Sequence, residues 1–445
     1  MWCYIHNNDI DKFIQQYPDL QDIFQSIVLL QTKDMCFLPR YMYVKYPSNL
    51  LTVYQGKTNN QEFDSIDLQF TGQLRQNQLP IVKHALNLYQ ANGHLCGIIK
   101  ARPGLGKTVI ATYLTCKLGL KTLIVVDNSN LLKQWVNAFY NFTNIDTEMS
   151  IFKQKLYQTT TPVTIGMIQT LTRRLKNDLK KTYELVNNNN FGLVIYDEVH
   201  NTSAASEFAK GSLLFRTKNI LGLSATPFQT GVGEILMMNT IGDIIYETTD
   251  YELTPEFKFI HYESDLPAKN KAVINKTQDY IMRKSMYNKF IVKSEKYLDV
   301  IESYTHQLYN QGHKILILCF TKKQVENISD RLNAKGLYNT MFYGEQKEIQ
   351  YNETILVTTY AFAGKGFDYA DLSAMILACP LAGKKSIIQT VGRILRIADN
   401  KIPPVVIDLI DMSLQHMMLP ELKMKKQIIK NEFKCKISEE YFGDD

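Results

Sequence analysis

The sequence lacks the closely spaced cysteine pairs that bind zinc or iron–sulfur clusters. Its 445 residues include seven cysteines, widely scattered and without a C-x-x-C pair: Cys3, Cys36, Cys96, Cys116, Cys319, Cys379 and Cys435. This pattern indicates neither a zinc ribbon nor an iron–sulfur cluster. An odd number of cysteines in a long chain is typical of reduced thiols in an intracellular protein.

Long apolar runs are also missing. Residues 1–11 contain no basic stretch followed by an apolar one, so no secretory signal is expected. No uninterrupted apolar segment approaches the length that spans a bilayer. We therefore expect a soluble intracellular protein without a membrane partner, located in the cytoplasm or nucleoid, or in the host cytoplasm if the chain is viral.

A large excess of charge is absent as well. The chain has 50 Lys and Arg against 44 Asp and Glu, which gives a formal net charge of +6. This mildly basic balance fits a polyanionic partner but does not require one. The hydrophobic content of 45% is that of an ordinary globular protein, and the length suits about two or three domains.

Short apolar segments alternate with amphipathic ones along most of the chain. Near-continuous apolar runs predict strands buried on both faces of a parallel sheet, at 95–100, 122–127, 163–167, 193–197 and 220–224. Helices are predicted between them, at 108–118 and 130–142. The alternation resumes with strands at 314–320, 353–358, 374–378 and 405–409 and a helix at 323–335. It indicates the α/β class with right-handed crossovers.

Two segments fall outside this alternation. Residues 1–70 contain short Tyr-rich runs at 40–45 and 50–54, which we interpret as strands of a small, separate N-terminal domain. Residues 251–297 are charged and aromatic, and we interpret them as a linker with a helix near 278–293. The expected parts are 1–70, 71–250, 251–297 and 298–445.

A glycine-rich turn follows the first predicted strand of the 71–250 part. Ala101-Arg102-Pro103-Gly104-Leu105-Gly106-Lys107-Thr108 leads directly into a helix pattern, which is the Walker A arrangement with Ala in place of the first Gly. The glycines allow backbone N–H groups to face one anion, and the helix N-terminus adds partial positive charge. We expect residues 103–108 to bind ATP, with Lys107 on the β- and γ-phosphates and Thr108 on Mg²⁺.

Two carboxylates follow the apolar run that ends at Tyr196. Asp197-Glu198-Val199-His200 lies at the exit of a buried strand, where α/β sheets bind ligands. We expect Asp197 to hold Mg²⁺ and Glu198 to orient or deprotonate the attacking water. His200 would link this site to neighbouring polar groups.

These two motifs, taken with further ones, resemble those of superfamily 2 helicases. Ser224-Ala225-Thr226 is similar to the family's Ser-Ala-Thr motif, which couples the ATP site to strand separation. Gln73-Leu74-Arg75-Gln76-Asn77-Gln78 is similar to its adenine-recognising segment, in which Gln78 would read the adenine and Arg75 would support it. The resemblance implies two tandem RecA-like parallel-sheet domains with a small N-terminal α+β domain, and ATP and Mg²⁺ as cofactors.

The second block carries the other half of the resemblance. Gly364-Lys365-Gly366-Phe367-Asp368 is similar to motif V, and Gln389-Thr390-Val391-Gly392-Arg393-Ile394-Leu395-Arg396 to motif VI. The resemblance assigns Gly366, Asp368 and Gln389 to nucleotide binding. Arg393 and Arg396 would share a face if this stretch is helical, and would stabilise the departing phosphate as arginine fingers. The ATP site would thus draw on both domains.

One segment favours DNA over RNA. Residues 128–139 contain Leu-x-x-Gln-Trp, which resembles motif Ia of the DNA-directed group with its phage UvsW-type, XPB-like, RecG-like and type III restriction-like members. DEAD-box RNA helicases have a different segment there. The N-terminal part resembles the layout of UvsW-type proteins, which implies that it contacts DNA.

We therefore predict an ATP-dependent DNA helicase or branch-migrating translocase that acts on forked, branched or duplex DNA in replication, recombination or repair, with proteins of those processes as candidate partners. Three alternatives remain: an RNA helicase or transcript-release factor, an ATPase that remodels protein–DNA complexes without unwinding, and the motor subunit of a restriction system. Contacts should go mainly to the phosphates of the tracked strand. The candidate contact residues are Ser129, Lys133, Gln169, Arg173, Thr321 and Thr358.

Overall fold

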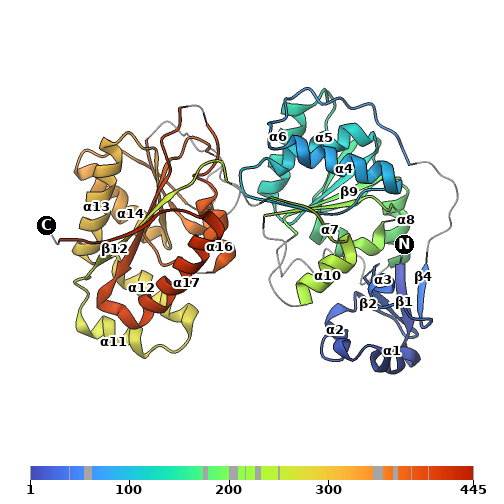
Figure 1. Ribbon diagram of the computed structural model, residues 1–445, viewed down its shortest axis with the longest axis horizontal. Coiled ribbons are helices and arrows are strands. Elements are labelled where there is room, and N and C mark those ends of the chain that lie inside the picture. The colour runs from blue at the N-terminus through green and yellow to red at the C-terminus, as the bar shows by residue number, and fades with distance from the viewer. Residues whose placement is uncertain are drawn as a thin grey trace. The chain divides into compact units, whose positions relative to one another are not determined.

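The chain folds into two compact units, Met1–Thr248 and Thr249–Asp445 (Figure 1). The computed structural model describes residues 2–39, 41–54, 63–173, 179–199, 209–215, 217–225, 232–248, 251–343, 354–363, 369–381, 383–398 and 400–443. No helix in these ranges is both long and apolar enough to cross a membrane.

An antiparallel sheet with the order β2-β3-β1-β4 begins the first unit. Its elements are β1 (Trp2–His6), α1 (Ile10–Gln16), α2 (Phe24–Ile27), β2 (Leu30–Gln31), β3 (Met35–Leu38), α3 (Met42–Lys45) and β4 (Leu51–Tyr54). The strand predicted at 40–45 is wrong. A single helical turn there buries Met42 and leaves Val44 61% exposed, which an extended strand would not do.

This N-terminal sheet shares its apolar core with the rest of the first unit. Phe24 and Ile27 of α2 belong to one buried cluster with Leu236 and Ile241 of α10 (Val232–Ile241). The N–H of Tyr41 adds a hydrogen bond of 2.8 Å to the carbonyl of Asn239. The separate N-terminal domain that we expected is therefore packed onto the first unit by a continuous core.

A seven-stranded parallel sheet forms the centre of the first unit, in the order β11-β5-β10-β9-β6-β8-β7. All five predicted strands are present: β5 (Cys96–Ala101), β6 (Thr122–Val126), β8 (Val163–Met167), β9 (Leu193–Asp197) and β10 (Ile220–Ser224). The sequence did not predict the edge strands β7 (Ser150–Phe152) and β11 (Ile244–Thr248). The helices are α4 (Leu79–Asn92), α5 (Lys107–Leu118), α6 (Ser129–Phe142), α7 (Ile168–Thr172), α8 (Leu179–Asn187) and α10.

The second unit has its own seven-stranded parallel sheet, in the order β14-β15-β13-β16-β17-β12-β18. The strands are β12 (Glu256–Tyr262), β13 (Ile315–Cys319), β14 (Thr340–Phe342), β15 (Ile355–Thr359), β16 (Ala374–Leu377), β17 (Val405–Asp411) and β18 (Ile437–Tyr441). The helices are α11 (Ala268–Lys276), α12 (Tyr280–Ile291), α13 (Glu295–Asn310), α14 (Lys322–Ala334), α15 (Tyr360–Ala363), α16 (Lys384–Val391) and α17 (Gln415–Phe433). Two parallel sheets of this kind confirm the expected RecA-like architecture.

The segment 251–297 is not the linker that we expected. Its strand β12 lies inside the second sheet, hydrogen-bonded to β17 on one side and β18 on the other. Phe257, Phe259 and Ile260 are fully buried in the core of that unit. The sequence did not predict this strand because charged residues lie between the buried ones, and successive side chains of a strand point to opposite faces of the sheet.

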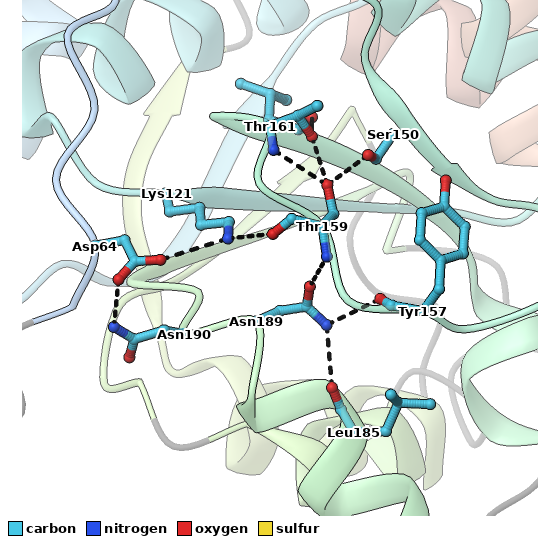
Figure 2. A network of polar contacts seen from close by, with 10 residues as sticks. Asp64, Lys121, Ser150, Tyr157, Thr159, Thr161, Leu185, Asn189 and Asn190 are labelled. Atoms are coloured by element: carbon cyan, nitrogen blue, oxygen red, sulfur yellow. Dashed lines mark hydrogen bonds and ion pairs between the residues drawn. The ribbon is translucent and has the colours of Figure 1, made fainter.

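A network of polar contacts closes the amino-terminal end of the first sheet (Figure 2). Lys121, directly before β6 and 5% exposed, donates to the carbonyl of Thr159 at 2.6 Å and lies 3.4 Å from a carboxylate oxygen of Asp64. Asn189 accepts from the N–H of Thr159 at 2.7 Å and donates to the carbonyl of Tyr157 at 3.1 Å. The polar side chains at this end of the sheet therefore bond to one another and to the backbone. Ligands are expected at the opposite end, where the carboxyl termini of the strands meet.

Candidate functional site

The glycine-rich turn joins β5 to α5 at the carboxyl end of the first sheet. Gly104 and Gly106 have φ values of 82° and 85°, the left-handed region that glycine enters without steric cost. Gly106 is the N-cap of α5, so Lys107 and Thr108 occupy its first turn. The Lys107 ammonium folds back to the carbonyl of Ala101 at 3.3 Å. The turn therefore places a cation at the positive end of a helix, where an anion would bind.

The segment before α4 is tied directly to this turn. The side-chain amide of Gln78 donates to the carbonyl of Leu105 at 2.7 Å and accepts from the N–H of Arg75 at 2.9 Å. The Arg75 guanidinium reaches the carbonyl of Gly104 at 3.3 Å. Gln78 is 2% exposed, and a Cβ at Gly106 would lie 2.5 Å from its amide nitrogen. Arg75 and Gln78 thus brace this turn, the expected phosphate loop at residues 103–108, and the adenine contact of Gln78 stays a prediction.

The acidic pair follows β9, two strands from β5 in the same sheet. β10 lies between them and pairs Leu223 with both Ile99 of β5 and Asp197 of β9. Asp197 is 4% exposed and accepts hydrogen bonds from the indole N–H of Trp135 at 2.8 Å and from the N–H of Glu198 at 2.9 Å. Glu198 has a φ of 53°, uncommon for a residue other than glycine and often found at functional sites.

Burial and the neighbouring Glu198 carboxylate raise the pKa of Asp197 to about 7. The Trp135 hydrogen bond and the positive charge of Lys107 act in the opposite direction. Asp197 and Lys107 therefore belong to one electrostatic site, although 90 residues separate them in sequence. The sequence did not predict the contact of Trp135: the Gln-Trp pattern marked α6 but gave no partner for the indole.

The donor set is compatible with Mg²⁺ bound together with a nucleotide. Each Asp197 oxygen accepts one hydrogen bond from the protein, which leaves a second lone pair for a cation or its water. Thr108 is partly exposed and offers a hydroxyl at the start of α5. Magnesium in proteins commonly takes one or two side-chain oxygens, with water and phosphate completing its octahedron. Among the described residues no group of three His, Cys, Asp or Glu side chains could hold a metal alone.

The expected coupling motif lies only partly in the described chain. Ser224 ends β10 fully buried, in register with Lys100 of β5, and Ala225 is 9% exposed. The motif therefore begins between the strand of the phosphate loop and the strand of the acidic pair. His200 and Thr226 lie outside the described residues, as do Gly366 and Asp368 of the second block.

Four of the candidate nucleic-acid contacts lie on the first unit and are exposed: Ser129, Lys133, Gln169 and Arg173. Asn128 caps α6 and accepts from the N–H groups of Asn130 and Leu131, and the exposed Ser129 is the first residue of this capped helix. Gln169 donates to the carbonyl of Asp127 at 2.9 Å, which fixes α7 beside that N-terminus. These residues are placed together and their contact with phosphate remains a prediction.

The two candidates on the second unit use their side chains in hydrogen bonds within the protein. Thr358 is fully buried and its hydroxyl donates to the carbonyl of Phe342 at 2.7 Å, so its side chain is not available to a nucleic acid. Thr321 is the N-cap of α14, where it forms a reciprocal capping box with Gln324. The prediction for Thr358 is wrong because this residue lies inside β15 with its side chain in the core.

The arginine pair follows α16. This helix ends at Val391, and residues 392–395 continue as turns in which the N–H of Arg393 bonds to the carbonyl of Thr390 at 3.2 Å. Arg393 and Arg396 therefore do not share one face of an α-helix. Both are partly exposed, as is Gln389 in the last turn of α16.

Lys401, which the sequence did not single out, holds this arginine turn in place. Its ammonium donates to the carbonyl of Arg396 at 2.6 Å and to the carbonyl of Ala370 at 2.7 Å. Burial and the positive charge of Arg396 lower the pKa of Lys401 to about 8. A lone lysine in a loop gives no sequence signal for such a contact.

Comparisons with known proteins agree with this geometry. The family model described as "Type III restriction enzyme, res subunit" matches residues 71–229, which contain the phosphate loop and the acidic pair. A mimivirus protein described as an ATP-dependent RNA helicase (Acanthamoeba polyphaga mimivirus) is 27% identical over 379 residues, covering 80% of this chain and 67% of that protein. A helicase of Escherichia phage T5 is 26% identical over 350 residues, covering 75% and 70%.

A relative with a shorter match carries a DNA assignment in its name. The DNA 3'-5' helicase XPB of Mycobacterium tuberculosis is 32% identical over 152 residues, which cover 34% of this chain and 27% of that protein.

Solved structures share the fold at low sequence identity. Saccharomyces cerevisiae Dbp5 bound to RNA and ADP BeF3 has a TM-score of 0.54 at 15% identity and covers 82% of this chain and 90% of its own. The ATP-dependent Type ISP restriction-modification enzyme LlaBIII bound to DNA has a TM-score of 0.57 at 14% identity, covering 84% of this chain and 32% of its own.

Proposed function

The chain belongs to the superfamily 2 helicases of the type III restriction-like group and is an ATP-dependent helicase, and on this premise we propose that its substrate is DNA. In this proposal it hydrolyses ATP to move along DNA and to unwind it or migrate its branches. The Leu-x-x-Gln-Trp segment of α6 supports DNA, as do the match to the restriction-enzyme family and the XPB relative.

One observation supports a coupling between ATP hydrolysis and DNA binding. It is the hydrogen bond between Trp135 and Asp197. Trp135 lies on α6, and the exposed Ser129 is the first residue of the same helix. The Trp135 indole donates a hydrogen bond to Asp197, the carboxylate proposed to hold the metal ion. A helix that moves with bound phosphate would therefore shift a group at the ATP site. Because this contact is buried, a small displacement of α6 would change the position or the hydrogen bonding of the Asp197 carboxylate.

We propose the following roles in hydrolysis. Lys107 neutralises the charge of the β- and γ-phosphates, Thr108 and Asp197 hold Mg²⁺, and Glu198 orients or deprotonates the water. When bound, Mg²⁺ would supply positive charge to the phosphate oxygens. Arg393 and Arg396 of the second unit are proposed to stabilise the charge that builds on the departing phosphate.

A set of ATPase assays tests the substrate. Hydrolysis is measured with single-stranded DNA, duplex, fork, four-way junction and RNA, and strand displacement is measured on the same substrates. We expect stimulation by DNA and displacement on branched DNA. Stimulation by RNA alone would instead favour an RNA helicase, a function that the mimivirus relative's name describes. Stimulation by DNA without strand displacement would favour a remodelling ATPase.

Substitution Lys107→Ala tests the ATP site. We expect hydrolysis to become undetectable, because losing a cation at transferring phosphates costs several orders of magnitude in rate. The matched control is Lys117→Ala in the last turn of the same helix, which should retain the wild-type rate. Retained hydrolysis in Lys107→Ala would exclude the proposed site.

A further inference from the structure

One helical segment of the second unit carries a marked excess of positive charge. Residues 268–296, which span α11 and α12, contain eight basic residues and two acidic ones. Their excess of positive charge equals the net charge of +6 of the whole chain. None of the helicase motifs lies here, so the nucleotide site does not account for this charge.

Five of these basic side chains are exposed: Lys269, Lys276, Lys289, Lys293 and Lys296. Within the described chain none of the five takes part in an ion pair. The two acidic residues are engaged elsewhere, since Asp279 caps α12 at the N–H of Met282 and Glu295 lies 3.1 Å from Arg331. The lysines therefore keep their charge open to solvent.

Two basic residues at the end of the neighbouring helix α14 show the opposite arrangement. Arg331 of α14 contacts Asp299 at 2.5 Å and Glu302 at 2.6 Å, and Lys335 contacts Glu302 at 3.3 Å. These two basic side chains are paired within the protein, unlike the five exposed lysines between residues 269 and 296.

Large apolar side chains are exposed on the same helices. Ile281 is 77% exposed, Met282 53%, and Val273 and Tyr280 43% each. A surface that combines open cations with apolar side chains suits the phosphates and the sugar or base faces of a nucleic acid.

We propose that α11, α12 and the turn that leads into α13 form a second nucleic-acid-binding surface, in which the five open lysines hold the phosphate backbone and Ile281 and Met282 pack against sugars or bases. The inference rests on the proposed function, because it takes nucleic acid as the substrate. Lys269 and Lys276 are two helical turns apart on one face, about 10 Å along the axis, and so follow a strand. The N-terminal part is less suited to this role, since residues 1–70 carry eight acidic and five basic residues.

The salt dependence of binding tests this surface. Lysines 269, 276, 289 and 293 are replaced together by Gln in the full chain, and binding to a labelled forked DNA and to single-stranded RNA is measured by anisotropy at several salt concentrations without ATP. Each lost phosphate contact lowers the slope of log affinity against log salt by roughly 0.7–0.9. We expect a loss of at least two such contacts and about tenfold weaker binding.

The control variant replaces four exposed lysines of the first unit, Lys33, Lys45, Lys117 and Lys180, and should keep the wild-type slope. A second variant, Ile281→Ser with Met282→Ser, should weaken binding without changing the slope. An unchanged slope in the four-lysine variant, with wild-type circular dichroism and melting, would overturn the inference. The proposed function would survive that result if DNA still stimulates the wild-type ATPase, so the two failures are distinguishable.

Discussion

At the scale of single residues, Asp197 of the proposed ATP site can change its protonation near neutral pH. Its pKa of about 7 lies far above the ordinary value of 3.8. In the ligand-free protein the protonated form is favoured by the fold, so its contribution to stability is present below about pH 4 and is lost as pH rises through about 7. Magnesium binding has the opposite requirement, because only the carboxylate is a good ligand.

Substitution Trp135→Phe should shift the pH dependence of hydrolysis. The indole hydrogen bond stabilises the charged form of Asp197, so its removal raises the carboxyl pKa further. We expect the acidic limb of the kcat/KM profile, measured at constant free Mg²⁺, to move to higher pH. The control is Phe139→Leu, because Phe139 stacks on Trp135 without contacting Asp197. An acidic limb at the wild-type pH in Trp135→Phe would disprove the electrostatic role of the indole.

Substitution Lys401→Met should disorder the arginine turn. Two partly buried carbonyls, of Ala370 and Arg396, would lose their donor, at a cost of about 1 kcal/mol in stability for each hydrogen bond. We expect kcat to fall more than the KM for ATP changes, and Lys401→Arg to restore part of kcat. The matched control is Lys384→Met, which removes an exposed ion pair with Glu432 worth at most about 1 kcal/mol. Equal loss in both variants would contradict a positioning role for Lys401.

At the scale of elements, the central strands were predictable and the edges were not. β6, β9 and β10 are buried at every residue, so their sequences are continuous apolar runs that predict a strand. The edge strands β7 and β14 have three residues each, too few for a pattern. The strand β12 was missed because polar residues alternate with its buried ones, and the arginine turn because no local pattern tells a helix from successive turns.

The site itself was predicted only in part, and for a similar reason. The motifs placed Lys107, Asp197 and Glu198 after the ends of predicted strands. The carboxyl ends of parallel strands lie at the same edge of a sheet, so these residues were expected to lie near one another. The contacts of Trp135, Gln78 and Lys401 depend on side chains from segments far apart in sequence. Local patterns carry no information on such long-range contacts.

The two ends of helix α5 provide an element-scale prediction. At Gly106 a Cβ would have both a strained φ of 85° and a contact of 2.5 Å with the Gln78 amide. At Gly119 the φ is 62°, but the nearest atom is 3.6 Å away. We expect Gly119→Ala to lower stability by roughly 1 kcal/mol with little change in the KM for ATP. Gly106→Ala should lower stability and also raise that KM at least tenfold, as measured by initial rates. Equal KM values for the two variants would contradict the bracing role of Gln78.

At the scale of the whole molecule, the N-terminal sheet and the first parallel sheet form one body. Replacing Ile27, fully buried in α2, by Ala removes apolar contacts from the shared core and should cost about 2–5 kcal/mol. We expect faster amide hydrogen exchange in α10 as well as in the N-terminal sheet. Ile328→Ala, a matched cavity in α14 of the second unit, should leave α10 unchanged. Exchange confined to residues 2–54 would show that the N-terminal sheet is an independent domain.

The shared core has a further consequence during synthesis on the ribosome. Strand β4 of the N-terminal sheet ends at Tyr54, but α10, against which this sheet packs, ends only at Ile241. At about 5–20 residues per second, roughly 10–40 seconds pass between the two. During that interval α10 has not been synthesised, and the apolar face of the N-terminal sheet that packs against it is exposed. We expect a chaperone near the ribosomal exit to bind this face of the nascent chain.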